Sequence, residues 1–254
     1  MKQITDFELM ETVDYGKSVW QRYRSLVPLP LIEAGQFVQV RVDDSPSTYL
    51  RRPISIHDVE PSKNEISLLV QKAGEGTQHI AALPVGATVN MVLPLGNSFT
   101  LPQSDREQVL LVGGGIGIAP LYYWGKVLKS NGITLQFLLG GKSKSDLIRR
   151  ETYEKIAPVA CTTEDGSWGE KGFVTQHSIW QQTRFDRIYV CGPKPMMKAV
   201  AALCKEKDLW CEVSLENLMA CGLGACLCCV ENTTEGHLCV CKEGPIFNIR
   251  RLLW

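Results

Sequence analysis

The sequence predicts an antiparallel β-barrel, then a parallel α/β domain, then a short cysteine-rich module. Three observations support this fold class. Short, partly alternating apolar segments separated by turn residues fill the first part of the chain, which is typical of a small barrel. Strand-like and helical segments then alternate over residues 105–216, as in a parallel sheet with helices on both faces. Residues 221–241 hold six of the ten cysteines.

The barrel domain is predicted to span residues 1–101. Prolines, glycines and clusters of Asp, Asn and Ser separate its strands, because these residues favour turns. One helical segment, at residues 77–83, interrupts them. The expected strands lie at residues 7–15, 18–26, 37–42, 53–59, 66–72 and 88–93.

The α/β domain is predicted to span residues 102–216. The expected strands are 108–112, 133–139, 159–163, 187–191 and 210–215, and the expected helices are 120–130, 145–156, 175–182 and 195–205. Residues 217–254 form the predicted third domain. They are too few for a core of their own, so a bound cluster would supply their organisation.

Composition limits the partners and the compartment. The 254 residues include 27 Lys+Arg and 27 Asp+Glu, and no block of like charges occurs, so nucleic acid is not an expected partner. No apolar run reaches the length of a membrane span, so no membrane association is expected. No signal-peptide pattern begins the sequence, and a reducing, cytoplasmic setting suits so many thiols.

The cysteine spacing indicates an iron–sulfur cluster. Cys221, Cys226 and Cys229 form C-x4-C-x2-C, and Cys241 follows after a gap of eleven residues. The first three match the plant-type [2Fe–2S] spacing. Glycines between the first two cysteines allow the backbone to fold closely around a cluster. Such a cluster carries one electron at a time, so the chain is expected to transfer electrons.

Two other interpretations of these cysteines fit the spacing less well. Structural zinc usually takes two separated C-x2-C pairs, whereas only one occurs here. Disulfides suit small secreted chains, and this chain is too large to need them. Cys228 and Cys239 could serve as alternative ligands, although buried thiols are the simpler expectation.

A glycine-rich segment, LVGGGIGIAP at residues 111–120, joins the first parallel strand to its helix. Small residues there let a diphosphate approach the backbone beside a helix N-terminus. The segment differs from G-x-G-x-x-G because Pro120 replaces the last glycine, so a purely structural turn is the alternative. The nucleotide contacts are expected at Gly113, Gly114, Gly115 and Gly117.

A second loop, CGPKPMM at residues 191–197, follows a later strand of the same sheet. Cys191 would reach the carboxyl edge of the sheet near the nicotinamide, together with Gly192 and Pro193. The alternative is a small buried residue in a loop bounded by prolines.

Two barrel segments suit a flavin. In RRPISI, residues 51–56, Arg52 can neutralise a diphosphate and Ser55 can bond the isoalloxazine ring. In AGEGT, residues 73–77, Gly76 and Thr77 would begin a short helix with amides free for phosphate. A solvated strand end is the alternative for the arginine pair. The four histidines form no ligand or catalytic pattern, so we expect no catalytic residue, and cofactors would supply the chemistry.

The order RPIS, GEGT, GGGIGIAP, CGP resembles the ferredoxin–NADP reductase superfamily, which pairs a flavin-binding antiparallel barrel with a nicotinamide-binding domain. The C-terminal ACGLGACLCCV and CVCKEGPIF resemble the electron-transfer subunits of NAD-dependent (class 1B) dihydroorotate dehydrogenase. The resemblance implies that FAD, a [2Fe–2S] cluster and NAD are bound. It implies FAD contacts at Arg52, Pro53, Ile54, Ser55, Leu69, Val70, Gln71, Gly76 and Thr77, and cluster ligands at Cys221, Cys226, Cys229 and Cys241.

The resemblance also implies a partner. In this family a separate FMN-containing catalytic subunit oxidises dihydroorotate to orotate in pyrimidine biosynthesis. Electrons would pass from FMN through [2Fe–2S] and FAD to NAD+, in a heterotetramer of two subunits of each kind. Cys228 departs from the glycine common in the family, and Lys142 and Lys144 could meet the 2′-phosphate of NADP.

Alternatives to this function stay open at this point. The small subunit of NADH-dependent ferredoxin:NADP+ oxidoreductase is similar, but its first cluster ligand is typically aspartate, where this chain has Cys221. A stand-alone reductase would usually carry a longer ferredoxin domain. A non-enzymatic redox sensor or a zinc-stabilised binding module would lack flavin.

Overall fold

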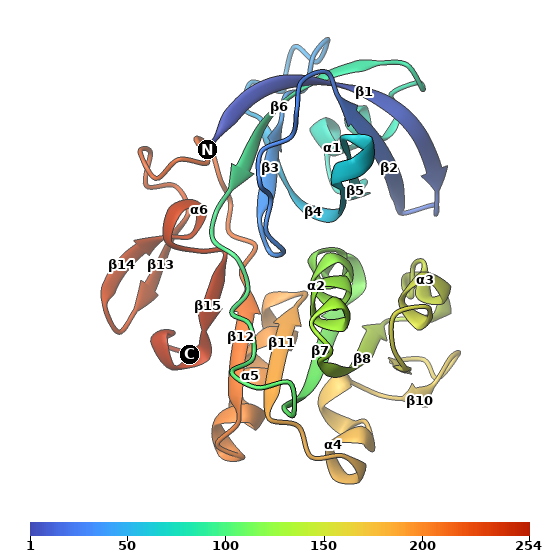
Figure 1. Ribbon diagram of the computed structural model, residues 1–254, viewed down its shortest axis with the longest axis vertical. Coiled ribbons are helices and arrows are strands. Elements are labelled where there is room, and N and C mark those ends of the chain that lie inside the picture. Colours follow the sequence, from blue (N-terminus) through green and yellow to red (C-terminus); the bar gives the residue numbers. More distant parts are fainter. The chain divides into compact units, whose positions relative to one another are not determined.

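The computed structural model describes residues 1–254. The chain divides into two compact units, each with contributions from the C-terminal segment (Figure 1). The first unit comprises Met1–Ser98, Asn217–Glu231 and His237–Pro245, and the second comprises Phe99–Glu216, Asn232–Gly236 and Ile246–Trp254. Residues 217–254, which the sequence predicts to be a third domain, are therefore shared between the two units.

The first unit contains a closed six-stranded antiparallel barrel with strand order β1-β2-β5-β4-β3-β6. The strands are β1 (Gln3–Asp14), β2 (Ser18–Ser25), β3 (Phe37–Val40), β4 (Arg52–Glu60), β5 (Glu65–Gln71) and β6 (Thr88–Leu95), with helix α1 at Glu75–Ala81 and a 3-10 turn at Pro61–Lys63. Burial alternates along parts of β1 and β2, whereas β3 and most of β5 are buried on both faces. Phe7, Leu9 and Leu68 are fully buried. The predicted barrel is confirmed.

The second unit contains a seven-stranded sheet with order β10-β9-β8-β7-β11-β12-β15. The strands are β7 (Gln108–Gly114), β8 (Thr134–Gly141), β9 (Val159–Thr163), β10 (Glu170–Lys171), β11 (Arg187–Cys191), β12 (Trp210–Ser214) and β15 (Ile246–Asn248). All neighbouring strands run parallel except β12 and β15. The predicted parallel sheet is therefore confirmed, and it has an added antiparallel edge.

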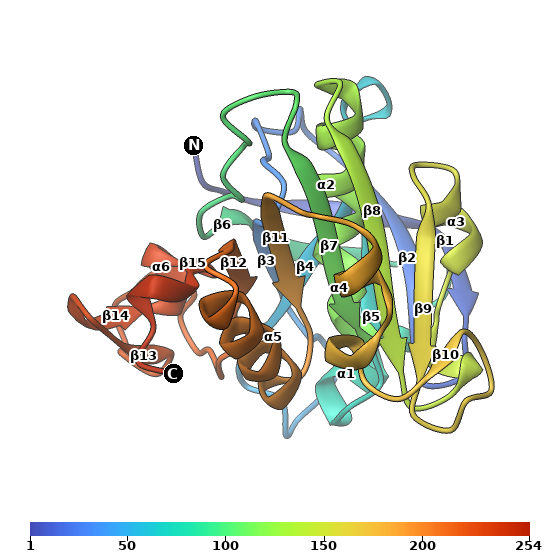
Figure 2. The ribbon, with the colours of Figure 1, turned by 90° about the horizontal axis from the view of Figure 1, so that it is seen from below.

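Helices cover both faces of this sheet (Figure 2). Helix α2 (Ala119–Ser130) connects β7 to β8, and α5 (Lys194–Glu206) connects β11 to β12. From the central pair β7–β11 the chain moves outward in opposite directions, and right-handed crossovers then place the two helices on opposite faces. The strand order consequently reverses between β7 and β11, where α/β sheets bind ligands.

Two of the predicted helices are wrong in length. Residues 145–156 form a 3-10 turn at Lys144–Asp146 and a short helix α3 at Arg150–Glu154. Arg149 separates them because its φ of 57° is left-handed. Residues 175–182 likewise form a 3-10 turn at Val174–Gln176 and helix α4 at Ile179–Gln182, because His177 is extended, with ψ of 139°.

After the cysteine loop come strands β13 (Val230–Thr233) and β14 (Gly236–Cys239), which pair with each other, helix α6 (Val240–Glu243), and a 3-10 turn at Ile249–Arg251 that follows β15. The described chain contains no helix that combines the length and apolarity needed to cross a bilayer.

Candidate iron–sulfur, flavin and nicotinamide sites

The four predicted cluster ligands lie together in the first unit. Cys221, Cys226 and Cys229 lie on the loop before β13, and Cys241 lies in α6. The amide of Gly224 donates a hydrogen bond of 3.1 Å to Cys241 Sγ, and the Cys241 amide donates one of 3.3 Å to Cys229 Sγ. These bonds join ligands that are far apart in the sequence.

Backbone amides also surround the first ligand. The Leu223 amide donates to Cys221 Sγ at 3.3 Å. This bond, with further donation from the Cys226 and Ala225 amides, lowers the pKa of Cys221 to about 6. The thiolate is the form that ligates a metal, so the loop already favours the ligating state of Cys221.

The thiol of Cys241 is in a different environment. Burial, followed by its contacts with Cys229, raises the pKa of Cys241 to about 12. It becomes a ligand only when a bound metal displaces its proton.

The donor set fits a two-iron cluster. The sulfurs interact in two pairs, Cys221 with Cys226 and Cys229 with Cys241. A [2Fe–2S] cluster divides four thiolates between two irons, and these two pairs match that division. Gly222 and Gly224 have φ of 70° and 83°, which larger residues adopt only at a cost. The loop conformation therefore requires glycine at both positions.

The two additional cysteines differ in position. Cys228 is exposed. Cys239 is buried and its thiol donates to the Gly224 carbonyl at 3.8 Å. Burial, then the proximity of Cys229, raises the pKa of Cys239. Cys239 thus lies beside the predicted ligands as a neutral thiol.

The two flavin segments of the sequence meet in the barrel unit. A Cβ added to Gly76 would lie 2.6 Å from Arg52 Nε, so the guanidinium packs on the first turn of α1. The Arg52 guanidinium donates to the Leu50 carbonyl at 2.6 Å, which fixes its direction. The Arg52 guanidinium and the first turn of α1 suit an FAD diphosphate. The hydroxyl of Thr77, in contrast, accepts from the Ala73 and Gly74 amides at 3.1 Å and stabilises the start of α1.

The remaining predicted FAD contacts lie on two neighbouring strands. Pro53, Ile54 and Ser55 are half-buried on β4. On β5, Leu69 and Val70 are buried, and Gln71 is exposed. The FAD contacts of all these residues stay predictions.

The two nicotinamide motifs meet where the sheet order reverses. Cys191 at the end of β11 is paired with Gly113 at the end of β7. A Cβ on Gly117 would lie 2.5 Å from the Gly192 amide nitrogen, and one on Gly192 would lie 2.6 Å from Met196 Cε. Gly117 and Gly192 are thus required for packing between the loops. Gly115, with φ of 53°, has no heavy atom within 4 Å of its Cβ position, so it offers open backbone to a diphosphate.

Cys191 itself is fully buried in the second unit. Burial, then the charge of Glu216, raises its pKa well above the ordinary thiol value. Cys191 therefore stays a neutral thiol at physiological pH, and it is suited to packing and hydrogen bonding rather than to nucleophilic chemistry.

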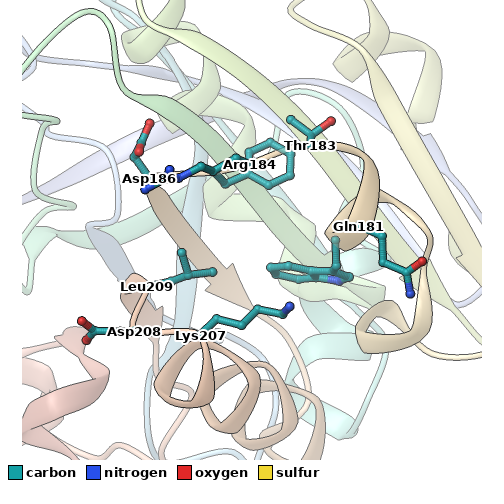
Figure 3. A pocket seen from close by; sticks show the side chains of 9 residues that line it. Gln181, Thr183, Arg184, Asp186, Lys207, Asp208 and Leu209 are labelled. Atoms are coloured by element: carbon teal, nitrogen blue, oxygen red, sulfur yellow. The ribbon is translucent and has the colours of Figure 1, made fainter.

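The second unit also contains a cavity of about 580 Å³ (Figure 3). Its lining comes from two segments, one that leads into β11 and one that leads into β12: residues 180, 181 and 183–186, and residues 207–209. This is the amino end of the parallel strands, opposite the glycine loops. The cavity is therefore separate from the predicted nicotinamide site.

Sequence reasoning missed one contributor to the cluster site. Gln39 on β3 contacts the cysteine loop, since a Cβ on Gly222 would lie 2.9 Å from Gln39 Cγ. In the sequence, Gln39 stands out as a single polar residue between two valines. Such a residue is ordinarily assigned to a solvent-facing position on a strand.

Solved structures define the class of protein. The chain superposes on a structure described as the NADH-dependent reduced ferredoxin-NADP oxidoreductase with a TM-score of 0.89 and 29% identity, covering 98% of this chain and 90% of the other. A ferredoxin reductase in carbazole 1,9a-dioxygenase gives a TM-score of 0.71 at 19% identity, over 82% of this chain and 67% of the other, which shows shared fold alone. With the cysteine site, these likenesses define an iron–sulfur flavin reductase that uses a nicotinamide.

Sequence relatives give the particular family. The family model for the iron–sulfur cluster binding domain of dihydroorotate dehydrogenase B matches residues 216–253, and that for the oxidoreductase NAD-binding domain matches residues 111–202. The electron transfer subunit of dihydroorotate dehydrogenase B (NAD(+)) from Shouchella clausii is 41% identical over 85% of each chain. Its counterpart from Bacillus pumilus is 37% identical over 84% of each chain.

The chain belongs to the family of electron transfer subunits of NAD-dependent dihydroorotate dehydrogenase B. The resemblance stated from the sequence is thereby confirmed. The predicted cofactors FAD, [2Fe–2S] and NAD agree with the matched iron–sulfur and NAD-binding domains and with the ferredoxin-reductase fold.

Proposed function

We propose that this chain receives electrons from an FMN-containing catalytic subunit that oxidises dihydroorotate to orotate, and delivers them to NAD+ in pyrimidine biosynthesis. The oxidation releases two electrons and two protons, and NAD+ takes both electrons with one proton as a hydride. The observation that carries the proposal is the placement of the four cysteines in the same unit as the barrel, with hydrogen bonds that join Cys241 to Gly224 and to Cys229.

Each site has a distinct task in this proposal. Cys221, Cys226, Cys229 and Cys241 would hold the cluster. Arg52 and Gly76 would bind the FAD diphosphate, and the open backbone at Gly115 would bind that of NAD. FAD, when bound, supplies the means to collect single electrons and release them as a hydride. The chain itself positions these groups, and we assign it no catalytic residue.

The cysteine loop suits a protein partner. Leu218, Leu223 and Leu227 are 87%, 49% and 65% exposed, and exposed apolar side chains in one segment mark interaction surfaces. A partner that covers this loop would place its own electron donor close to the cluster. We propose the FMN catalytic subunit at this surface, in a heterotetramer of two subunits of each kind. Six cysteines besides the four predicted ligands, none of them in a disulfide, support a reducing, cytoplasmic setting.

A second candidate is the small subunit of an NADH-dependent ferredoxin:NADP+ oxidoreductase. The TM-score of 0.89 to a structure of that description favours it. Cys221, where that family typically has aspartate, favours the dihydroorotate system.

The test is an anaerobic pull-down of the tagged chain from its native extract, followed by an assay of dihydroorotate-dependent NAD+ reduction. We expect activity together with a co-purified FMN protein. A chain that carries flavin and cluster absorbance but is inactive with dihydroorotate would reject this partner and favour the ferredoxin-linked alternative.

A further inference from the structure

Gln39 is a buried amide without a hydrogen-bond partner in the chain. Its side chain lies on β3 and is 1% exposed, and neither Nε2 nor Oε1 has a partner. Buried polar groups are nearly always hydrogen-bonded, since leaving one unpaired destabilises the protein. An amide with both ends unpaired therefore points to a group outside the polypeptide.

The barrel satisfies its other fully buried glutamine. Gln21 is 0% exposed, its Nε2 donates to the Ile80 carbonyl at 2.9 Å, and its Oε1 accepts from the Tyr23 hydroxyl at 2.8 Å. The contrast shows that this barrel can pair a buried glutamine with its own atoms. Gln39 is the exception.

The surroundings of Gln39 connect two of the predicted sites. In the β3–β4 ladder Gln39 is paired with Pro53, and Phe37 is paired with Ser55. Directly paired residues share one face, as do residues two apart on a strand. The Gln39 side chain therefore lies on the same face of the barrel as Pro53 and Ser55, both predicted FAD contacts.

The cysteine loop covers the same side chain. A Cβ on Gly222 would lie 2.9 Å from Gln39 Cγ and 3.1 Å from Gln39 Nε2. Gly222 directly follows Cys221, so the amide adjoins the backbone next to a predicted cluster ligand. Strand β3 is buried on both faces, as this covering loop requires.

We propose that Gln39 is a positioning residue between the flavin and the cluster, with its Nε2 donating a hydrogen bond to the sulfur side of the cluster. The inference deepens the proposed function, since it rests on [2Fe–2S] at the four cysteines and FAD at the β4 face. Gln39 makes and breaks no covalent bond and carries no charge. A hydrogen bond to cluster sulfur stabilises the more negative, reduced state and so raises the reduction potential.

The test uses the full chain loaded with FAD and cluster. Gln39→Met keeps an unbranched side chain of similar length and removes both hydrogen-bonding groups. We expect iron and flavin contents like those of the wild type and a lower cluster potential in a titration followed by electron paramagnetic resonance. The expected fall is several-fold to tenfold in the equilibrium constant for one-electron reduction, and tenfold corresponds to 59 mV.

Gln21→Met is the matched control. It removes two hydrogen bonds within the barrel, so it should lower the thermal midpoint and leave the cluster potential unchanged. Gln39→Met breaks no bond within the chain, so its thermal midpoint should fall less than that of Gln21→Met. If Gln39→Met fails to load, Gln39→Glu provides the same readout, and its carboxylate should also lower the potential.

The outcomes separate this inference from the proposed function. A wild-type chain without iron and sulfide would reject the cluster itself. If the wild-type chain holds the cluster, the comparison with the loaded Gln39→Met variant tests the role of Gln39 alone. A change of less than twofold in the equilibrium constant for one-electron reduction would reject that role and leave the proposed function standing.

Discussion

The Gly224 amide and the Cys241 sulfur are joined by a hydrogen bond of 3.1 Å across a separation of 17 residues. Because Cys241 in turn donates its own amide to Cys229, the loop and helix α6 are connected through sulfur before any metal is considered. The Gly224 amide thus contributes to how closely the cysteine loop approaches helix α6.

Replacing Gly224 should impair cluster retention. Gly224 has φ of 83°, and a Cβ there would lie 2.9 Å from Lys242 Cδ. Left-handed backbone costs a non-glycine residue about 1–2 kcal/mol, and relief of that strain would move the amide away from Cys241. We expect Gly224→Ala to contain less iron per chain and to lose its visible absorbance faster in air.

Gly236→Ala is the control, because Gly236 has φ of 99° and open space at its Cβ position. It carries similar backbone strain outside the cysteine loop. Equal iron loss in both variants would contradict a specific role for the Gly224 amide.

The ligand assignment makes a prediction about single cysteines. Cys226→Ser should abolish cluster assembly, whereas Cys228→Ser, at an exposed position, should keep the iron content of the wild type. Iron and sulfide analysis of the purified variants measures whether each one holds the cluster. Loss of iron from Cys228→Ser would make Cys228 a ligand.

Arg52 should matter for flavin retention because its guanidinium packs against Gly76. Arg52→Met keeps much of the stem and removes the charge, so we expect lower FAD occupancy after gel filtration. Arg41→Met is the control, since Arg41 pairs only with Asp43 at 2.6 Å among the ion pairs of the barrel and should retain flavin. Full occupancy in Arg52→Met would count against the phosphate role.

Substitutions at two glycines of the nicotinamide loop should distinguish a role in packing from a role in nucleotide binding. Gly117→Ala would force a Cβ to within 2.5 Å of the Gly192 nitrogen, and overpacking of this kind costs about 1–3 kcal/mol. We expect a lower thermal midpoint for Gly117→Ala. Gly115→Ala meets no neighbour, but its φ of 53° costs alanine about 1–2 kcal/mol, so its thermal midpoint should fall as well. Only Gly115→Ala should also raise the KM for NADH, and a raised KM in Gly117→Ala alone would refute the distinction.

The start of α4 should depend on pH through His177. The Ile179 amide donates to His177 Nδ1 at 3.0 Å, and burial lowers the pKa of His177 below its usual 6.5 although Glu170 opposes this. The folded state therefore binds fewer protons than the unfolded state, and stability from this bond is lost as pH falls below 6.5. A titration of the His177 ring by NMR should give a pKa below 6.5, and a value at or above 6.5 would contradict this pH dependence.

The sequence predicted strands better than contacts between distant segments. Alternation and turn residues are local, and all six barrel strands were found near their predicted positions. The helix predicted over 145–156 failed at Arg149, whose left-handed φ leaves no mark in the apolar pattern. Cysteine spacing identified the ligands, but it could not identify Gln39, because the contact between β3 and residue 222 joins segments about 180 residues apart.

Strand β15 gives the final residues a role in solubility. It pairs with β12 on the side away from β11, so it covers backbone groups that would otherwise form an open edge. Exposed edges recruit other chains and promote aggregation. A chain cut after Pro245 would keep every cysteine and still expose this edge. Expression of the protein should therefore preserve residues 246–254, and any tag belongs at the other terminus.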